Sequence, residues 1–222
     1  MKRQIVITGD GSATIQIEDW KEQYHSMHGA IQESEHVFIN SGLKQCLNII
    51  DSDPIKILEF GFGTGLNALL TFQEIERHTI DVEYTTIEAY PISEEEIAAL
   101  NYSDLLGMGS DVLLSFHNAE WEKDVKLSPS FTLRKTKSHF QSFHSEDRFT
   151  LVYYDAFGAR VQPELWERSI FEKIYNLLEV DGILVTYSSK GSVRRAMEDI
   201  GFKVERLKGP PGKRHMLRAS KI

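Results

Sequence analysis

The chain has 222 residues, 41% of them hydrophobic, and a formal net charge of −8 at pH 7. No run approaches the ~20 apolar residues that a membrane-spanning helix needs, and the N-terminus lacks the apolar core of a signal peptide, so we expect no membrane association. Cys46 is the only cysteine, which excludes an intramolecular disulfide and favours a cytoplasmic location. The length predicts one domain over residues 1–222.

The first 52 residues predict additions that precede the core of this domain. Polar and apolar side chains alternate over residues 4–17 around a Gly-Asp-Gly-Ser turn, which predicts an antiparallel hairpin. Residues 20–52 predict a helical extension, in which a helix starts at Glu22, is interrupted near Gly29 and ends before Pro54.

From residue 55 onward, strand and helix patterns alternate along the chain. We expect core strands at 55–60, 82–88, 149–154 and 183–187, and helices at 66–77, 163–178 and 191–200. Ser93, followed by three glutamates, predicts a further helix start. Residues 113–117 and 131–135 are both short strand candidates, and we favour the second as the third core strand.

The last two predicted strands, 202–207 and 214–219, are separated by a short turn with the sequence Gly-Pro-Pro-Gly. So short a connection joins only antiparallel strands. A doubly wound parallel sheet that ends in an antiparallel hairpin is the Rossmann-like architecture of class I S-adenosylmethionine-dependent methyltransferases. Dinucleotide-dependent dehydrogenases normally add a sixth parallel strand instead.

A glycine-rich loop follows the first core strand. Gly61, Gly63 and Gly65 allow a tight turn and let backbone N–H groups approach a ligand. A dinucleotide fingerprint spaces its glycines as G-x-G-x-x-G, and the carboxylate of Glu59 would repel a pyrophosphate. We therefore expect S-adenosylmethionine as the cofactor, with Glu59 binding its amino group. A structural turn, with Glu59 as a strand-end acid paired to a lysine, is the alternative.

Three further polar side chains follow core strands, at the edge of the sheet where ligands bind in such folds. Glu88 is predicted to accept the ribose hydroxyls, although an NAD enzyme would place an acid there too. Asp155 ends the central strand beside the expected methyl position, and His139 lies where adenine usually packs. Helix capping by the two acids and a structural role for His139 are the alternatives. The histidines show no metal-binding spacing, so we expect no metal.

Charge is unevenly distributed along the chain. Residues 189–222 carry ten Lys/Arg and three Asp/Glu, a balance of +7, which leaves −15 for residues 1–188. A basic region on an acidic body can bind phosphates locally while the body discourages nonspecific contact with nucleic acid. Solvation of the last helix and hairpin explains the same charge equally well.

Several segments together resemble the methyltransferases that modify the wobble uridine of bacterial tRNA, namely the MnmC methyltransferase domain and its stand-alone form MnmD. The resemblance extends in order from about residue 20 to residue 222. The segments that carry it are Tyr24–Ala30, Glu33–Ile39, Glu59–Asn67, Asp155–Phe157, Lys190–Arg195 and Gly209–Leu217. One departure is Ser138-His139, where the family pattern leads us to expect a Gly-Asp pair that contacts adenine.

The resemblance implies N-methylation of 5-aminomethyl-2-thiouridine to 5-methylaminomethyl-2-thiouridine, with separate enzymes supplying the aminomethyl substrate. It adds Asn67 to the predicted cofactor residues. Asp155 is expected to orient the amine and to take its proton as the methyl group arrives, and Phe157 either stacks on the uracil or packs in the core. The anticodon stem-loop would be bound through its phosphates by a basic set formed by Lys190, Arg194, Arg195, Lys213 and Arg214.

Two other classes of function remain open. A methyltransferase or aminopropyltransferase acting on a small amine would use the glycine loop, Glu88 and Asp155 but not the basic C-terminus. A catalytically silent RNA-binding protein would need none of the acidic residues, and the presence of Glu59, Glu88 and Asp155 together argues against it.

Overall fold

The computed structural model describes residues 2–49, 54–78 and 80–222, and within them eight strands form the main sheet. These strands are β4 (Ile55–Phe60), β5 (Val82–Ile87), β6 (Asp124–Ser128), β7 (Phe131–Thr136), β8 (Phe149–Tyr154), β9 (Leu178–Thr186), β10 (Phe202–Lys208) and β11 (His215–Lys221). Their order is β10-β11-β9-β8-β4-β5-β7-β6. Strands β9, β8, β4, β5 and β7 pair in parallel, whereas β11, β10 and β6 run antiparallel to their neighbours.

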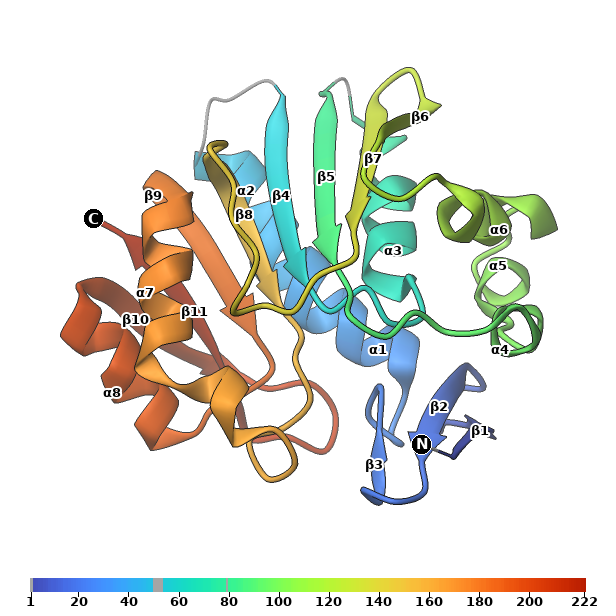
Figure 1. Cartoon of the computed structure of the whole chain (residues 1–222), viewed down its shortest axis with the longest axis horizontal. Coiled ribbons are helices and arrows are strands. Elements are labelled where there is room, and N and C mark those ends of the chain that lie inside the picture. Colours follow the sequence, from blue (N-terminus) through green and yellow to red (C-terminus); the bar gives the residue numbers. More distant parts are fainter. Residues whose placement is uncertain (1, 50–53, 79) are drawn as a thin grey trace.

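Helices cover both faces of this sheet (Figure 1). Elements α1 (Ala30–Ser34), η1 (Glu35–Leu43, a π-helix), α2 (Lys44–Ile49), α3 (Leu66–Ile75) and α6 (Ser110–Asn118) pack on one face. The opposite face is covered by α7 (Arg168–Leu177) and α8 (Gly191–Ile200). The connections contain α4 (Glu94–Ala98), α5 (Tyr102–Leu105) and a 3₁₀ turn, η2 (Pro163–Trp166).

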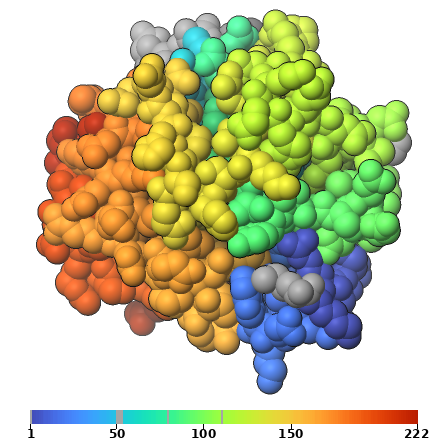
Figure 2. Space-filling view, in the orientation of Figure 1, coloured from blue at the N-terminus to red at the C-terminus, as the bar shows by residue number. Residues whose placement is uncertain are grey.

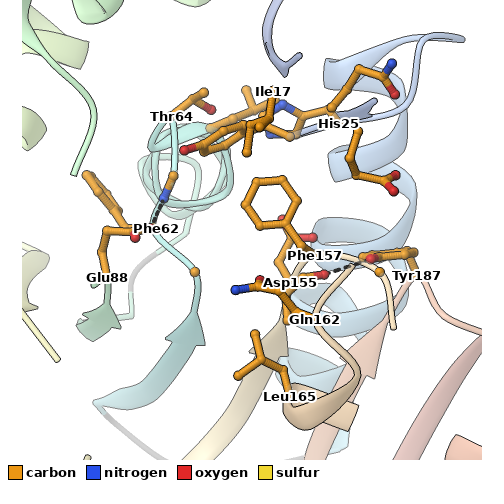
Figure 3. A pocket seen from close by; sticks show the side chains of 18 of the residues that line it. Ile17, His25, Phe62, Thr64, Glu88, Asp155, Phe157, Gln162, Leu165 and Tyr187 are labelled. Atoms are coloured by element: carbon orange, nitrogen blue, oxygen red, sulfur yellow. Dashed lines mark hydrogen bonds between the residues drawn. The ribbon is translucent and has the colours of Figure 1, made fainter. Parts of the chain in front are cut away.

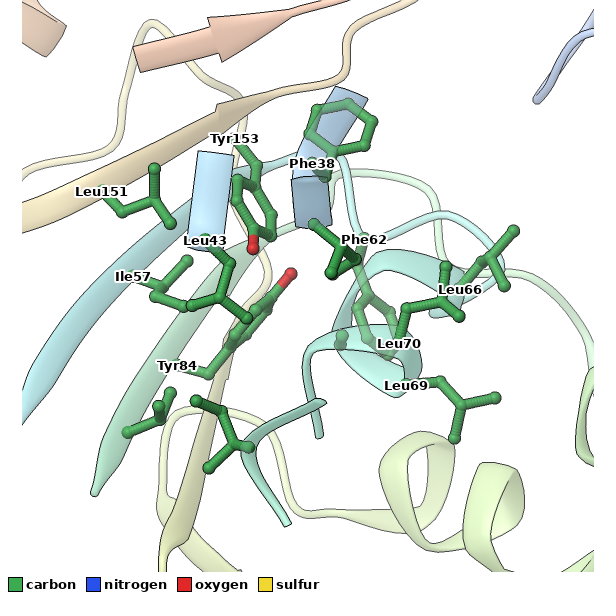
Figure 4. Close-up of a cluster of buried hydrophobic side chains, with 14 of the residues drawn as sticks. Phe38, Leu43, Ile57, Phe62, Leu66, Leu69, Leu70, Tyr84, Leu151 and Tyr153 are labelled. Carbon is green, nitrogen blue, oxygen red and sulfur yellow. The ribbon is translucent and has the colours of Figure 1, made fainter. Parts of the chain in front are cut away.

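Successive residues of each central strand are buried on opposite faces, as the near-continuous apolar strand sequences require. On β8, Tyr153 packs against Phe38 of η1 with ring centroids 5.1 Å apart (Figure 4). Its neighbour Tyr154 packs against Phe171 of α7 at 5.4 Å. The sheet is therefore the middle layer of three, and its strand ends are held in fixed positions.

A small N-terminal sheet, formed by β1 (Arg3–Ile7), β2 (Ala13–Ile17) and β3 (Glu22–Gln23), lies below the carboxyl ends of the main strands (Figure 1). Arg3 pairs with Glu96 at 3.2 Å, and Glu22 pairs with Arg160 at 2.7 Å. The space-filling view shows these N-terminal residues, in blue, in contact with the rest of the molecule (Figure 2). The predicted addition is thus attached to the edge of the sheet where ligands are expected.

Most predicted elements are confirmed, including the N-terminal hairpin, the core strands and the antiparallel C-terminal pair. Residues 113–117 were a wrong strand candidate, because Leu113 and Phe116 are buried three residues apart on one side of α6. The extension also differs from the prediction: Glu22 lies in β3, and helix begins only at Ala30. Residues 50–52 of the predicted extension lie outside the described residues.

Two further elements differ from expectation. Strand β6 was not predicted, and the helix expected over 163–178 is a 3₁₀ turn followed by α7. No helix in the described part of the chain is long and apolar enough to cross a membrane.

Candidate active site

A cavity of about 370 Å³ opens where the parallel strands end, at the point where the chain order reverses between β4 and β8. Such switch points are the usual ligand sites of open α/β sheets, and the volume lies within the range of small-molecule sites. Five strand ends contribute to its wall, through the residues that follow β4, β5, β7, β8 and β9.

The glycine loop forms one wall of the cavity. Gly61 and Gly63 line it with positive φ angles of 99° and 50°. A Cβ on Gly61 would lie 2.7 Å from the backbone oxygen of Asp155, so the close approach of the β4 and β8 ends requires glycine. The Gly63 N–H donates to Oε2 of Glu88 at 3.0 Å, which places Glu88 at the same wall (Figure 3). Gly65 is the N-cap of α3 and does not line the cavity.

Asn67 links two carboxylates behind and beside this loop. Its Nδ2 donates to Oε1 of Glu59 at 3.1 Å and to Oδ2 of Asp155 at 2.9 Å. Glu59 is fully buried and also accepts from the hydroxyl of Thr86 at 2.8 Å. The structure differs here from the prediction of a direct ligand contact, because Glu59 lies behind Asn67 and is not part of the cavity wall.

Burial changes the acidity of both carboxyl groups. Removal from water raises the pKa of Glu59 to about 8 and that of Asp155 to about 7, because the charged form is poorly solvated in each place. The hydrogen bond from Asn67 opposes both shifts. Asp155 therefore has a much higher affinity for a proton than the ordinary Asp pKa of about 3.9 suggests.

An aromatic group stands beside Asp155. Figure 3 shows the Phe157 ring over Asp155 and across the cavity from Glu88. Trp20 and Tyr24 contact Phe157 edge to face, with ring centroids 5.5 and 4.9 Å away. Both come from the N-terminal segment and both line the cavity. The sequence analysis missed these two residues, although aromatic side chains within a polar extension were an available signal.

An ion pair on the same side of the cavity joins the two ends of the chain. Nζ of Lys213 lies 2.5 Å from Oε1 of Glu33 and 3.9 Å from the centroid of the Tyr187 ring. The other Glu33 oxygen accepts from the Ser26 N–H at 2.7 Å, and the Tyr187 hydroxyl donates to the Ala156 carbonyl at 2.7 Å. Lys213, which was predicted to bind tRNA phosphates with four other basic residues, thus lies at the cavity against Glu33, apart from those residues.

The adenine side of the predicted cofactor site is an irregular loop after β7. His139 is exposed at the cavity rim, with its ring 5.6 Å from that of Tyr90. Lys173 of α7 fixes this loop by donating to the backbone carbonyls of Phe140, Gln141 and Phe143. Three acceptors on one ammonium group hold Phe140 and its neighbours against the cavity.

The remaining basic residues of the predicted tRNA surface do not line the cavity. Lys190 precedes α8, and Arg194 and Arg195 are exposed in its first two turns. Arg194 pairs weakly with Glu198 at 3.7 Å, and Arg214 is exposed in the β10–β11 connection. In the described part of the chain, no group of three or more His, Cys, Asp or Glu residues is arranged to hold a metal.

Comparison with known proteins supports the fold. Residues 124–222 match a family described as S-adenosyl-L-methionine-dependent methyltransferase. The crystal structure of MNMC2 from Aquifex aeolicus superposes with a TM-score of 0.80 at 25% identity, covering 99% of this chain and 70% of that one. The chain has the fold of a class I S-adenosylmethionine-dependent methyltransferase. S-adenosylmethionine is the methyl donor of this family, as the glycine loop predicted.

Sequence relatives carry the same family resemblance. The MnmC protein of Leptospira interrogans, named as a bifunctional protein of tRNA 5-methylaminomethyl-2-thiouridine biosynthesis, is 28% identical over 96% of this chain and 34% of its own length. The protein of that name from Pseudoalteromonas translucida is 27% identical over 90% of this chain and 33% of its own length. The predicted resemblance is confirmed. The chain spans about a third of the length of these relatives.

Proposed function

We propose that the chain transfers the methyl group of S-adenosylmethionine to the exocyclic amine of 5-aminomethyl-2-thiouridine at the tRNA wobble position. The observation that carries the proposal is the position of Asp155. This partly buried carboxyl group, with its pKa of about 7, lies between the glycine wall and the aromatic ring of Phe157. The names of the relatives suggest that the substrate is a modified uridine. The cavity offers space for an amine next to a proton acceptor, Asp155.

The residues present fit the cofactor on one observation of the cavity wall. Among the described residues, Oδ1 of Asn67 is buried without a hydrogen-bond partner although it belongs to the cavity wall. An acceptor left unpaired in this way suits an ammonium group. Asn67 would hold the amino group, Glu88 the ribose hydroxyls and His139 the adenine.

Glu59 supports this arrangement from behind. By accepting one N–H of Asn67, it fixes the amide so that Nδ2 faces the carboxylates and Oδ1 remains available. We therefore place Glu59 as a positioning residue for cofactor binding, in place of the direct contact with the amino group that the sequence suggested.

S-adenosylmethionine, when bound, supplies a methyl group on an excellent sulfonium leaving group. The chain therefore mainly has to present a neutral amine in line with that methyl group. Asp155 accepts a hydrogen bond from the amine and orients its lone pair. After transfer, the new secondary ammonium gives up one proton, and a carboxylate whose pKa is raised towards 7 accepts it more readily than an ordinary aspartate.

The tRNA would be bound outside the cavity by Lys190, Arg194, Arg195 and Arg214, with the wobble nucleotide turned into it. Enzymes acting earlier on the same tRNA would supply the aminomethyl group.

Mass spectrometry of wobble nucleosides tests the proposal directly. The purified protein, S-adenosylmethionine and tRNA bearing the aminomethyl group should yield 5-methylaminomethyl-2-thiouridine, heavier by one methyl group in place of a hydrogen. Omission of the cofactor and the Asp155→Asn variant serve as controls. Methylation of free polyamines with no change in the tRNA would reject the tRNA substrate in favour of a small amine.

A further inference from the structure

The wall of the cavity beside Asp155 carries charges of alternating sign. Lys213 bonds to Glu33 and lies over the face of Tyr187, whose hydroxyl reaches the backbone next to Asp155. Burial is the main cause that raises the pKa of Asp155, and the carboxylate of Glu33 raises it further, whereas the Asn67 hydrogen bond and the ammonium of Lys213 lower it. Carboxyl, ammonium and carboxylate groups therefore occur together within electrostatic range along one side of the site.

The edge of a 5-aminomethyluracil ring presents the complementary pattern. Moving around the ring from the C5 substituent, the side-chain amine is a donor, O4 is an acceptor and N3–H is a donor. An amine held by Asp155 therefore directs the next two groups of the ring edge along the wall that Lys213 and Glu33 occupy.

We propose that Lys213 and Glu33 select uridine by its base edge, with Nζ of Lys213 donating to O4 and the carboxylate of Glu33 accepting from N3–H. The inference rests on the proposed function and deepens it, because it assigns base recognition to residues outside the loop after β8 that carries Asp155. Flipped bases are commonly read in this way, by hydrogen bonds to the edge combined with aromatic packing.

Both side chains retain the bonding capacity that this role requires. Lys213 has three N–H donors, and one of them is directed to Glu33. Oε1 of Glu33 accepts a hydrogen bond from Lys213 and Oε2 accepts one from Ser26, and each oxygen has a second lone pair. The Glu33 side chain is only 8% exposed, so its orientation is fixed before a base enters. Preorganised groups of this kind lose little entropy on binding.

The same arrangement disfavours cytidine. Cytosine presents an amino donor in place of O4 and an unprotonated acceptor in place of N3–H. The donor would face the ammonium of Lys213, and the acceptor would face the carboxylate of Glu33. Two unfavourable contacts in a water-poor site reject a base more strongly than the loss of one attraction does.

Two anticodon stem-loop RNAs that differ only at the wobble base test this inference. One carries 5-aminomethyluridine and the other 5-aminomethylcytidine, and kcat/KM is measured for each by methyl incorporation. The wild-type protein should prefer the uridine RNA by ~100-fold or more. In Glu33→Gln, whose amide can donate or accept, the preference should fall by ~10-fold or more, while affinity for S-adenosylhomocysteine stays within ~3-fold.

Glu22→Gln is the matched control. Glu22 also lines the cavity and also pairs with a cation, Arg160, so the change removes the same charge from a second, more exposed ion pair. It should leave the ratio between the two RNAs unchanged. The same ratio is measured for Lys213→Gln, which changes the other partner of the ion pair. If Glu33→Gln fails to bind S-adenosylhomocysteine, the result for Lys213→Gln tests the inference in its place.

The outcomes separate the inference from the proposed function. If the wild-type protein methylates the uridine RNA, and the variants at Glu33 and Lys213 both keep its selectivity, the pair is only a structural tie between chain ends. If Glu22→Gln loses selectivity equally, the effect belongs to the rim in general and the inference fails. If the wild-type protein methylates neither RNA, the proposed function fails first and base reading fails with it.

Discussion

The two halves of the cavity are constructed differently. The cofactor half consists mainly of the turns that follow neighbouring strands β4 and β5, together with the loop after β7, and its main link, from Gly63 to Glu88, spans only 25 residues. The substrate half combines the loop after β8 with segments from both ends of the chain. Its ion pair, from Glu33 to Lys213, spans 180 residues.

The difference indicates how such a fold separates a general task from a specific one. The cofactor half depends on backbone turns within consecutive βα units, which any member of the architecture can form. The substrate half depends on the N-terminal sheet and the β10–β11 connection meeting over Asp155. We therefore expect substitutions in the cofactor half to affect cofactor affinity, and substitutions in the substrate half to affect turnover or selectivity.

The largest effect should come from Asp155→Asn, which keeps an oxygen for Asn67 but removes the base. We expect kcat to fall by about 10²- to 10⁴-fold, the usual contribution of a positioned base. Affinity for S-adenosylhomocysteine, measured by calorimetry, should change by less than ~3-fold. Equal losses in turnover and affinity would instead make Asp155 a cofactor ligand and would erase the division between the two halves.

The pH dependence of kcat/KM in the wild-type protein is a second test of Asp155 as the base. Because burial raises the pKa of Asp155 to about 7, the carboxyl group is largely protonated below that pH and cannot take the proton that the amine must lose. We expect kcat/KM to rise with pH through about 7, and Asp155→Asn to lose this limb. Persistence of the same limb in the variant would assign it to another group.

Gly63→Val should have the next largest effect, measured as a loss of cofactor affinity. A Cβ at this position lies 2.9 Å from the Tyr24 ring, and φ is +50°, which valine adopts only under strain. We expect affinity for S-adenosylhomocysteine to fall by about 10- to 100-fold. Gly107→Val is the matched control, because φ there is +66° with open space around it, so it should lower stability but not affinity.

Substitution of both Arg194 and Arg195 by uncharged residues tests whether the outer surface binds tRNA. If both contact phosphates, the slope of log affinity for tRNA against log salt should decrease in magnitude by roughly 1–2, with cofactor affinity unchanged. The control replaces Lys203 and Arg206, two exposed cations of edge strand β10, and alters net charge equally. A slope unchanged in the Arg194/Arg195 variant, or reduced equally in the control, would contradict specific phosphate binding by α8.

The smallest effect concerns Glu59, whose pKa is raised by burial from about 4.5 to about 8. The folded state holds this proton more tightly than the unfolded state, so the group's contribution to stability is present below pH 4.5 and is lost as the pH rises to about 8. Glu59→Gln should remove this dependence, raising Tm at pH 8 relative to wild type by about 2–4 °C. Glu83→Gln, a change at an exposed position of β5, is the control and should leave the pH dependence of Tm unchanged. Identical pH curves for wild type and Glu59→Gln would rule out a buried protonated carboxyl.

The cofactor half could be predicted from sequence because its signals are local. An apolar strand, glycines at alternate positions and an acid at the end of the next strand specify the turn, the close approach and the ligand type within 34 residues, from Ile55 to Glu88. The same holds for the parallel order and the closing hairpin, since connection length limits how strands pair. Residues 113–117 show the limit of such patterns, because a short apolar run fits a strand or a buried helix until its packing partners are known.

Only the tertiary structure decided which residues meet in the substrate half, and how strongly Glu59 and Asp155 are buried. Nothing near Trp20 or Glu33 in sequence indicates that they meet Phe157 and Lys213, which lie more than 130 residues away. The sequence predicted that Glu59 binds the cofactor and that Asp155 acts on the amine, both at the cavity, whereas packing places Glu59 behind Asn67 and leaves Asp155 facing the cavity. Local patterns fix backbone conformation, but burial and charge at a side chain are sums over all neighbours, and most of those neighbours are distant in the chain.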